Sequence, residues 1–230
     1  MSSNDSPVTI SAFIFDMDGL LVDTETLGSA TMDTLLRSYE REWRADAIPN
    51  MAGRRLPELM TAIAEAYTLT ATVDELCHRF ETQFIADVRG RLAPLPGVRE
   101  LIAFGREHGL RLALASSGWR QYVDAILLEA GLAGLFDAEV TGDEVTHGKP
   151  HPEPFLLAAA RLGVPPAECV VFEDAPAGVT AARAAGMHAV AVPCGGTLTA
   201  PFPVSPDITL TSLHEAPAWL HGLGVGVLAR

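Results

Sequence analysis

The feature that most constrains the fold is a regular alternation of short apolar runs and longer helical patterns from about residue 97 onward. The runs have the length of strands, and the segments between them are rich in Ala and Leu at helical spacing. We predict strands at residues 112–116, 136–141, 169–173, 189–192 and 208–210, and helices at residues 98–108, 119–130, 153–162, 175–185 and 216–221. Because such alternation gives parallel strands joined by right-handed crossovers, the sequence predicts a doubly wound, Rossmann-like α/β sheet.

Four of the predicted helices are followed by the same pair, a glycine and then an apolar residue. The pairs are Gly109-Leu110, Gly131-Leu132, Gly163-Val164 and Gly186-Met187. A glycine in the left-handed conformation, with the next apolar side chain folded back on the helix, is the Schellman-type helix end. The pairs therefore predict where these helices stop.

An earlier apolar run, residues 13–15, ends abruptly in Asp16, Met17, Asp18 and Gly19. In a strand the side chains of Asp16 and Asp18 leave on the same side, because strand side chains alternate with period two. Two carboxylates this close are unfavourable unless a cation lies between them or one is protonated. The pair indicates a divalent metal, acid/base chemistry or both, although Asp and Gly also form capped turns after strands.

Lys149 is the single lysine among 16 basic residues. It lies in a Gly-Lys-Pro-His-Pro segment, residues 148–152, whose two prolines stiffen the loop. A compact ammonium held this way suits a phosphate oxygen or an aspartyl phosphate, and an isolated surface lysine is the alternative. Asp16, Ser116 and Asp174 all lie at or just after predicted strand ends, where doubly wound sheets bind ligands.

Residues 23–92 break the α/β pattern because they contain helical patterns only, at residues 26–43, 56–67 and 73–88. We predict an all-helical cap over residues 23–92 and a discontinuous α/β core over residues 8–22 and 93–230. The joints near residues 22–24 and 91–94 would serve as hinges.

Composition excludes several classes of protein. Hydrophobic residues make up 48% of the 230 residues, yet no apolar run approaches the ~20 residues that cross a bilayer. The net charge of −13 argues against nucleic-acid binding. Cys77, Cys169 and Cys194 lack metal-type spacing and suit a reducing compartment. We expect a cytoplasmic protein without membrane or nucleic-acid partners, a monomer or a weak homodimer.

On these residues the chain resembles the haloacid dehalogenase-like superfamily of phosphohydrolases, in particular the branch of β-phosphoglucomutase and small sugar-phosphate phosphatases. The resemblance covers about residues 10–193 and rests on four motifs in order. They are Asp16-Met17-Asp18-Gly19 with the following residues 20–25, Ala115-Ser116-Ser117-Gly118, Gly148-Lys149-Pro150 and Val171-Phe172-Glu173-Asp174-Ala175-Pro176-Ala177-Gly178.

The resemblance implies a Mg²⁺-dependent phosphatase that hydrolyses a small phosphate monoester such as a sugar phosphate. Asp16 would attack phosphorus and become an aspartyl phosphate, and Asp18 would be the general acid and then the general base. Ser116, the backbone N–H of Ser117 and Lys149 would bind the phosphate.

The resemblance also implies the metal ligands. The Asp16 carboxylate, the backbone carbonyl of Asp18 and Asp174 would hold Mg²⁺, which prefers oxygen ligands, and Glu173 would complete or orient this set.

Mutases of this branch carry a histidine four residues after the threonine that corresponds to Thr24, whereas this chain has Gly28. This difference favours hydrolysis, with a β-phosphoglucomutase-type mutase as the alternative. A haloacid dehalogenase, a phosphorelay receiver domain and a non-catalytic binding module are disfavoured, because the complete acid set suits phosphorus and the motif order differs from that of receivers.

Substrate choice would fall to the cap. Arg54 and Arg55 could form a fork for a carboxylate, a hydroxyl cluster or a second phosphate, or they are solvated arginines at a helix start. Thr24, Glu25 and Trp119 are further candidates at the mouth of the site. Sugar phosphates, phosphoglycolate and small polyol phosphates all fit such a site.

Overall fold

The computed structural model describes residues 9–44, 47–48, 55–193 and 202–223. Their strands form one parallel sheet of six strands in the order β3-β2-β1-β4-β5-β6. The strands are β1 (Ala12–Phe15), β2 (Arg111–Ala115), β3 (Ala138–Val140), β4 (Cys169–Glu173), β5 (His188–Ala191) and β6 (Ile208–Thr209). The predicted doubly wound α/β sheet is therefore confirmed, with β1 at its centre.

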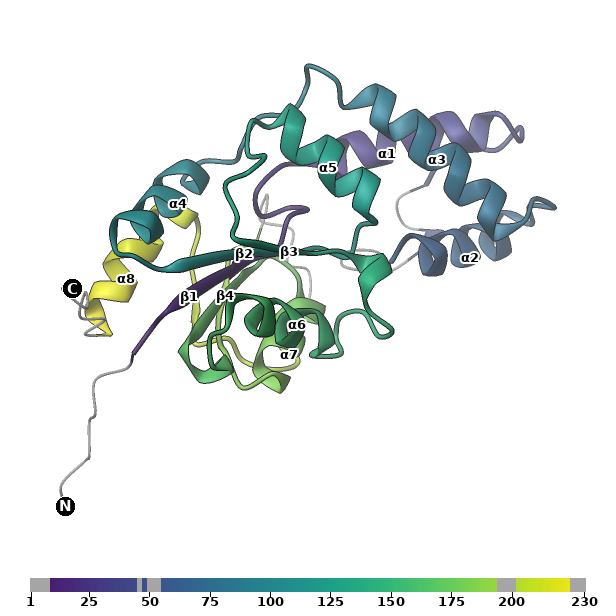
Figure 1. Ribbon diagram of the computed structural model, residues 1–230. Helices are drawn as coiled ribbons and strands as arrows, with labels where there is room; N and C mark the ends of the chain where they lie inside the picture. The colour runs from purple at the N-terminus through teal and green to yellow at the C-terminus, as the bar shows by residue number, and fades with distance from the viewer. Residues whose placement is uncertain (1–8, 45–46, 49–54, 194–201, 224–230) are drawn as a thin grey trace.

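Helices cover both faces of the sheet (Figure 1). They are α4 (Val98–Glu107), α5 (Arg120–Glu129), α6 (Glu153–Leu162), α7 (Pro176–Ala184) and α8 (Ala216–Gly222). Phe13 and Phe15 of β1 belong to the apolar cluster that includes α4 and α5, whereas Ala12 and Ile14 belong to the cluster with α6 and α7. The sheet therefore separates two cores, because successive strand side chains point to opposite faces.

The four glycine pairs end their helices as predicted. Gly109, Gly131, Gly163 and Gly186 have φ values of 69°, 63°, 68° and 74°. The N–H of each following residue donates to a carbonyl five positions back, as in Leu110 to Gly105 at 2.9 Å and Leu132 to Leu127 at 2.8 Å. These are the backbone hydrogen bonds of the Schellman motif.

The helical insertion forms a cap beside the sheet and consists of α1 (Glu25–Arg37), α2 (Leu56–Tyr67) and α3 (Val73–Asp87) (Figure 1). Helix α3 contacts both α1 and α2. The two connections of the insertion to the core run side by side. Val22 and Pro94 form an antiparallel bridge, and Leu95 N–H donates to the Leu21 carbonyl at 2.8 Å. The insertion is thus attached through one narrow neck.

Helix α1 is shorter than the prediction, which extended it to Trp43. The chain leaves the helix after Arg37, because the Ser38 hydroxyl donates to the Leu35 carbonyl at 2.6 Å and Glu40 adopts a left-handed φ of 59°. The sequence between Arg37 and Trp43 contains no glycine or proline, so it does not predict this turn.

None of the helices in the described ranges has the length and apolar character that a membrane crossing requires. Cys77 and Cys169 are free thiols, and Cys194 lies outside the described residues. Burial raises the pKa of the Cys169 thiol to about 12, which keeps it protonated and unreactive.

Candidate active site

Strand β1 delivers Asp16 to the carboxyl edge of the sheet. Its backbone N–H donates to the Phe172 carbonyl at 3.0 Å and so continues the pairing of β1 with β4. The Lys149 ammonium contacts the Asp16 carboxylate and lies 2.7 Å from Glu173 Oε1. The lysine side chain is 1% exposed, which excludes the surface-lysine alternative.

Burial and charge act on these groups in opposite directions. Burial raises the pKa of Asp16, and the Lys149 charge opposes this rise. Burial acts to lower the pKa of Lys149, but the carboxylates of Asp16 and Glu173 outweigh it and the pKa is raised. The lysine therefore stays charged, and Asp16 needs positive charge nearby to be ionised.

Glu173, at the end of β4, uses both of its carboxylate oxygens within the protein. Oε1 accepts from Lys149, and Oε2 accepts from the backbone N–H of Ala175 at 2.8 Å. A Cβ atom at Gly178 would lie 1.7 Å from Oε1, so only glycine admits the carboxylate there. This arrangement holds the lysine in place.

Asp18 accepts two hydroxyl hydrogen bonds on one oxygen. Thr24 Oγ1 donates to Oδ1 at 2.7 Å, and the Tyr122 hydroxyl donates to the same oxygen at 2.5 Å. The Ser116 hydroxyl lies 3.5 Å from Oδ2. Burial raises the pKa of Asp18, and the hydrogen bonds from Tyr122 and Thr24 oppose this rise.

Tyr122 is a site residue that the sequence analysis missed. It lies on α5, six residues after Ser116 and outside the family motifs, so its pattern is that of a core aromatic residue. Only its contact with Asp18 reveals it. Burial raises the pKa of Tyr122 well above its usual range, so the hydroxyl remains a donor.

Asp16, Glu173 and Asp174 form an acidic cluster that could hold a cation, because one carboxylate oxygen from each residue lies within 4.8 Å of the others. Gly19 has a φ of 80°, and a Cβ atom there would lie 2.2 Å from Asp174 Oδ2, so this turn requires glycine. With Asp18, this part of the site holds four acidic side chains and the Lys149 ammonium. This excess of negative charge and the oxygen-only donors fit a hard divalent cation.

The loop after β2 carries the predicted phosphate donors. The Ser116 hydroxyl accepts from Gly118 N–H at 3.0 Å, and Gly118 itself accepts from Gly142 N–H at 2.7 Å. A Cβ atom at Gly142 would lie 2.2 Å from the Ser117 carbonyl oxygen. The loop is therefore packed closely on η2 (Gly142–Glu144).

The loop that carries Lys149 is held by the first residue of α6. Glu153 accepts from the backbone N–H groups of Thr146 at 2.8 Å and His147 at 3.0 Å. From the cap, Arg55 donates to the Thr146 carbonyl at 3.3 Å and forms an ion pair with Glu58 at 2.8 Å.

A cavity of about 160 Å³ lies between the sheet edge and the cap. Its polar lining residues are Asp16, Asp18, Thr24, Ser117, Tyr122, Glu173 and Asp174, and its large apolar lining residues are Leu56, Leu59, Phe80, Phe84 and Trp119. The Ser116 hydroxyl contacts Asp18, and the Lys149 ammonium contacts Asp16 and Glu173.

The predicted cap residues lie in different places. Thr24 lines the cavity, and Glu25 is the first residue of α1. Arg55 is not among the lining residues and contacts Glu58 and Thr146 instead, so its role in substrate binding stays a prediction. Arg54 lies outside the described residues.

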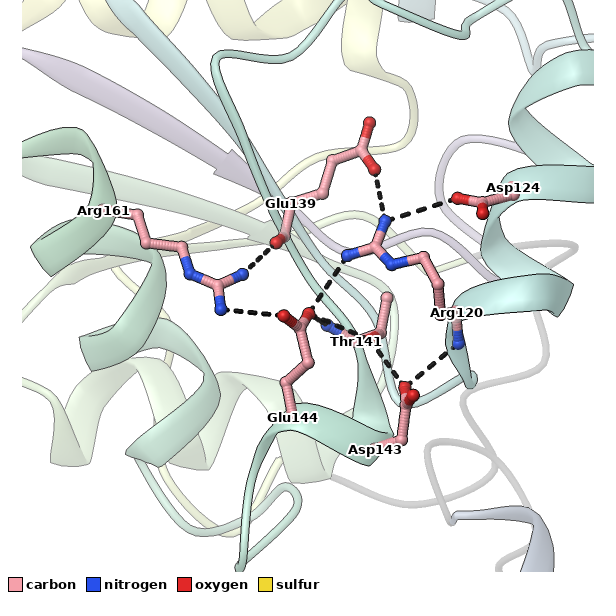
Figure 2. A network of polar contacts seen from close by, with 7 residues as sticks. All are labelled: Arg120, Asp124, Glu139, Thr141, Asp143, Glu144 and Arg161. Atoms are coloured by element: carbon pink, nitrogen blue, oxygen red, sulfur yellow. Dashed lines mark hydrogen bonds and ion pairs between the residues drawn. The ribbon is translucent and has the colours of Figure 1, made fainter.

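A polar network anchors the start of α5 (Figure 2). Arg120 pairs with Glu139 of β3 at 2.6 Å and with Glu144 at 3.1 Å, and its backbone N–H donates to Asp143 at 3.0 Å. Arg161 of α6 pairs with Glu144 at 2.8 Å. The network fixes the helix that presents Tyr122 to Asp18.

The chain matches the family model of haloacid dehalogenase-like hydrolases over residues 10–186. It is 34% identical over 215 residues to hexitol phosphatase B of Escherichia coli, covering 93% of this chain and 97% of that protein. It is 36% identical over 180 residues to fructose-1-phosphate phosphatase YqaB of Escherichia coli, covering 78% and 94%. The crystal structure of a putative β-phosphoglucomutase from Thermotoga maritima has a TM-score of 0.71 and 29% identity, covering 93% and 99%.

The chain therefore belongs to the haloacid dehalogenase-like hydrolases, near β-phosphoglucomutase and the sugar-phosphate phosphatases, as the motifs predicted. Within that family it is a phosphatase, a phosphoric monoester hydrolase. The match over residues 10–186 leaves the receiver-domain alternative without support.

Proposed function

We propose that this phosphatase hydrolyses the monophosphate of a small sugar or sugar alcohol through an aspartyl phosphate on Asp16, with Mg²⁺ at the acidic cluster. The observation that carries the proposal is the Lys149 ammonium, buried against Asp16 and Glu173 at the cavity that Asp18 also lines. The names of the hexitol and fructose-1-phosphate phosphatases support the choice of substrate class.

In the first step an Asp16 oxygen forms a bond to phosphorus while the ester P–O bond breaks. The electron pair of that bond leaves with the ester oxygen, which takes the proton from Asp18 Oδ2. Lys149 remains charged and offsets the charge that gathers between Asp16 and the phosphoryl oxygens. The products of this step are an alcohol, an aspartyl phosphate and the Asp18 carboxylate.

In the second step a water oxygen forms a bond to phosphorus, and the water proton moves to Asp18 Oδ2. The bond between phosphorus and Asp16 breaks, and its electron pair restores the Asp16 carboxylate. Inorganic phosphate leaves, and Asp18 is again protonated for the next cycle.

Asp16, Asp174 and the backbone carbonyl of Asp18 are the ligands we assign to Mg²⁺. When bound, the ion supplies charge neutralisation for the phosphoryl group and keeps Asp16 ionised. We assign Glu173 to the orientation of Lys149, because both of its oxygens already accept protein hydrogen bonds. The Ser116 hydroxyl and the backbone N–H of Ser117 are the proposed phosphate donors.

The cavity wall supports a small, largely uncharged leaving group. Its cap side consists of Leu56, Leu59, Phe80 and Phe84, which suit the C–H face of a sugar or polyol. Gly28 also lines the cavity and has no side chain to hold a bound sugar phosphate for return transfer, which supports hydrolysis over mutase activity.

We further propose that residues 23–92 act as the cap and that residues 8–22 and 93–230 form the catalytic core. The narrow neck at Val22 and Pro94 supports this division. Free thiols at Cys77 and Cys169 support a reducing, cytoplasmic location, and we propose a monomer or a weak homodimer.

The test is a panel of a hexitol phosphate, fructose 1-phosphate, phosphoglycolate and β-glucose 1-phosphate, each with Mg²⁺ or EDTA. We expect phosphate release from the first two esters at roughly tenfold or higher kcat/KM than from phosphoglycolate, lost in EDTA and restored by Mg²⁺. Release that persists in EDTA would contradict the metal assignment. Glucose 6-phosphate formed from β-glucose 1-phosphate faster than phosphate would establish the mutase alternative.

A further inference from the structure

Tyr122 contributes the shortest hydroxyl contact to Asp18, at 2.5 Å from Oδ1. The Tyr122 side chain is buried, with 8% of the residue exposed. We propose that Tyr122 is a positioning residue for the general acid: its hydroxyl fixes the Asp18 carboxyl group so that the opposite oxygen, Oδ2, faces the leaving oxygen of the substrate. This inference rests on the phosphatase chemistry proposed above.

The arrangement of donors explains why the hydroxyl matters. Thr24 and Tyr122 both donate to Oδ1, so that oxygen has little capacity left to carry a proton of its own. The contact at Oδ2 is the longer one, 3.5 Å from the Ser116 hydroxyl. The two donors therefore set the plane of the carboxyl group and leave Oδ2 as the oxygen with the weaker contact.

The Tyr122 ring packs against two other aromatic rings. It lies 4.7 Å from the Trp119 ring and 5.2 Å from the ring of Phe84, on cap helix α3. The network around Arg120 fixes the helix α5 from which it projects (Figure 2). Tyr122 thus contacts Phe84 of the cap, Trp119 of the core and the proposed general acid Asp18. Turning its hydroxyl away from Asp18 would disturb the packing of these rings.

Tyr122→Phe removes the hydroxyl and keeps the ring. A misplaced general acid should slow a reaction whose leaving oxygen needs a proton more than one whose leaving group departs as a stable anion. We expect kcat/KM to fall by roughly 10²-fold for phenyl phosphate and by less than about threefold for 4-nitrophenyl phosphate. KM for 4-nitrophenyl phosphate should change little, since Tyr122 is not assigned a phosphate contact.

Tyr67→Phe is the matched control. Tyr67 is equally buried, at 8%, and its hydroxyl accepts from Arg44 N–H at 3.0 Å in the cap, away from Asp18. In this variant the ratio of kcat/KM for phenyl phosphate to kcat/KM for 4-nitrophenyl phosphate should equal the wild-type ratio. Because each ratio compares two substrates on one enzyme sample, it does not depend on the fraction of folded protein.

An equal loss of kcat/KM for both esters in Tyr122→Phe, or no loss for either, would overturn the positioning role and leave Tyr122 as a packing residue. Failure of the wild-type enzyme to hydrolyse any phosphate ester would instead overturn the proposed function. A wild-type enzyme that accepts aryl phosphates but no sugar phosphate would change the substrate class and leave the test of Tyr122 intact.

Discussion

At the scale of single residues, Lys149 has the least replaceable position. It is buried against two carboxylates that follow or end different strands, and in the proposed mechanism its charge also offsets that of the phosphoryl group. Loss of the charge would leave Asp16 and Glu173 facing each other in a site of low dielectric constant. Such an unpaired buried arrangement is destabilising.

Lys149→Met keeps the length of the side chain and removes its charge. We expect kcat/KM with saturating Mg²⁺ to fall by roughly 10²-fold or more, as after deletion of an oxyanion donor. The free energy of unfolding in urea should fall by about 3 kcal/mol, because the two carboxylates lose their counter-charge.

Arg37→Met is the control for loss of a cation, because Arg37 forms an exposed ion pair with Asp33 on α1. It should leave kcat/KM unchanged. If Lys149→Met retained wild-type turnover, the ammonium would play no part in the reaction.

Gly19 and Gly178 are needed because acidic side chains from other parts of the chain pack against them. The sequence marks Gly19 as a turn and places Gly178 in a predicted helix, at the end of the fourth family motif. In the fold, Gly19 leaves room for Asp174 and Gly178 leaves room for Glu173. Both positions are small because an acid from elsewhere in the chain approaches them, which local sequence does not reveal.

At the scale of elements, the contact of α5, β3 and α6 depends on Glu144. The hydrogen bond from Arg161, against the opposing effect of burial, lowers the pKa of Glu144 from 4.5 to about 2. Because the pKa of Glu144 is lower in the folded state than in the unfolded state, its ionised form stabilises the fold. This contribution is fully present above pH 4.5 and is lost as the pH falls toward 2.

Glu144→Gln should therefore destabilise the protein at pH 7 by about 1 kcal/mol, a modest value because the side chain is 30% exposed and solvent screens its ion pairs. The difference in unfolding free energy between wild type and variant should shrink as the pH falls from about 5 toward 2. Urea unfolding of both proteins at pH 7 and at pH 4 measures this difference in free energy.

Glu107→Gln, which changes an exposed carboxylate at the end of α4, serves as the control and should keep the wild-type free energy of unfolding at pH 7. A deficit of Glu144→Gln that stayed constant over this pH range would show that the charge of Glu144 does not contribute to stability.

The same elements show how far the sequence determines the fold. The alternating pattern and the four glycine pairs predict the core helices and strands within one or two residues, because periodicity and helix stops are local properties. The end of α1 was predicted wrongly, since Ser38 and Glu40 form a turn that ordinary propensity does not mark. The rotation of α5, which aims Tyr122 at Asp18, depends on Arg120 and its distant partners.

At the scale of the whole molecule, the site is a product of the parallel sheet. Asp16, Ser116, Lys149 and Glu173 are far apart in the chain, and their contacts arise where β1, β2 and β4 end at one edge. That convergence could be predicted, because carboxyl ends of parallel strands share an edge. The contact of Arg55 with Thr146 could not be predicted, because it depends on how the cap helices lie against the core.

The most direct test of the account is to find the residue that carries the phosphoryl group during turnover. The enzyme is mixed with excess 4-nitrophenyl phosphate and Mg²⁺, quenched rapidly in acid and analysed by peptide mass spectrometry, with Asp16→Asn in parallel. We predict one phosphoryl group on the peptide that contains Asp16 and neither phosphopeptide nor turnover in Asp16→Asn. A phosphoryl group on another residue, or normal turnover by Asp16→Asn, would contradict the account.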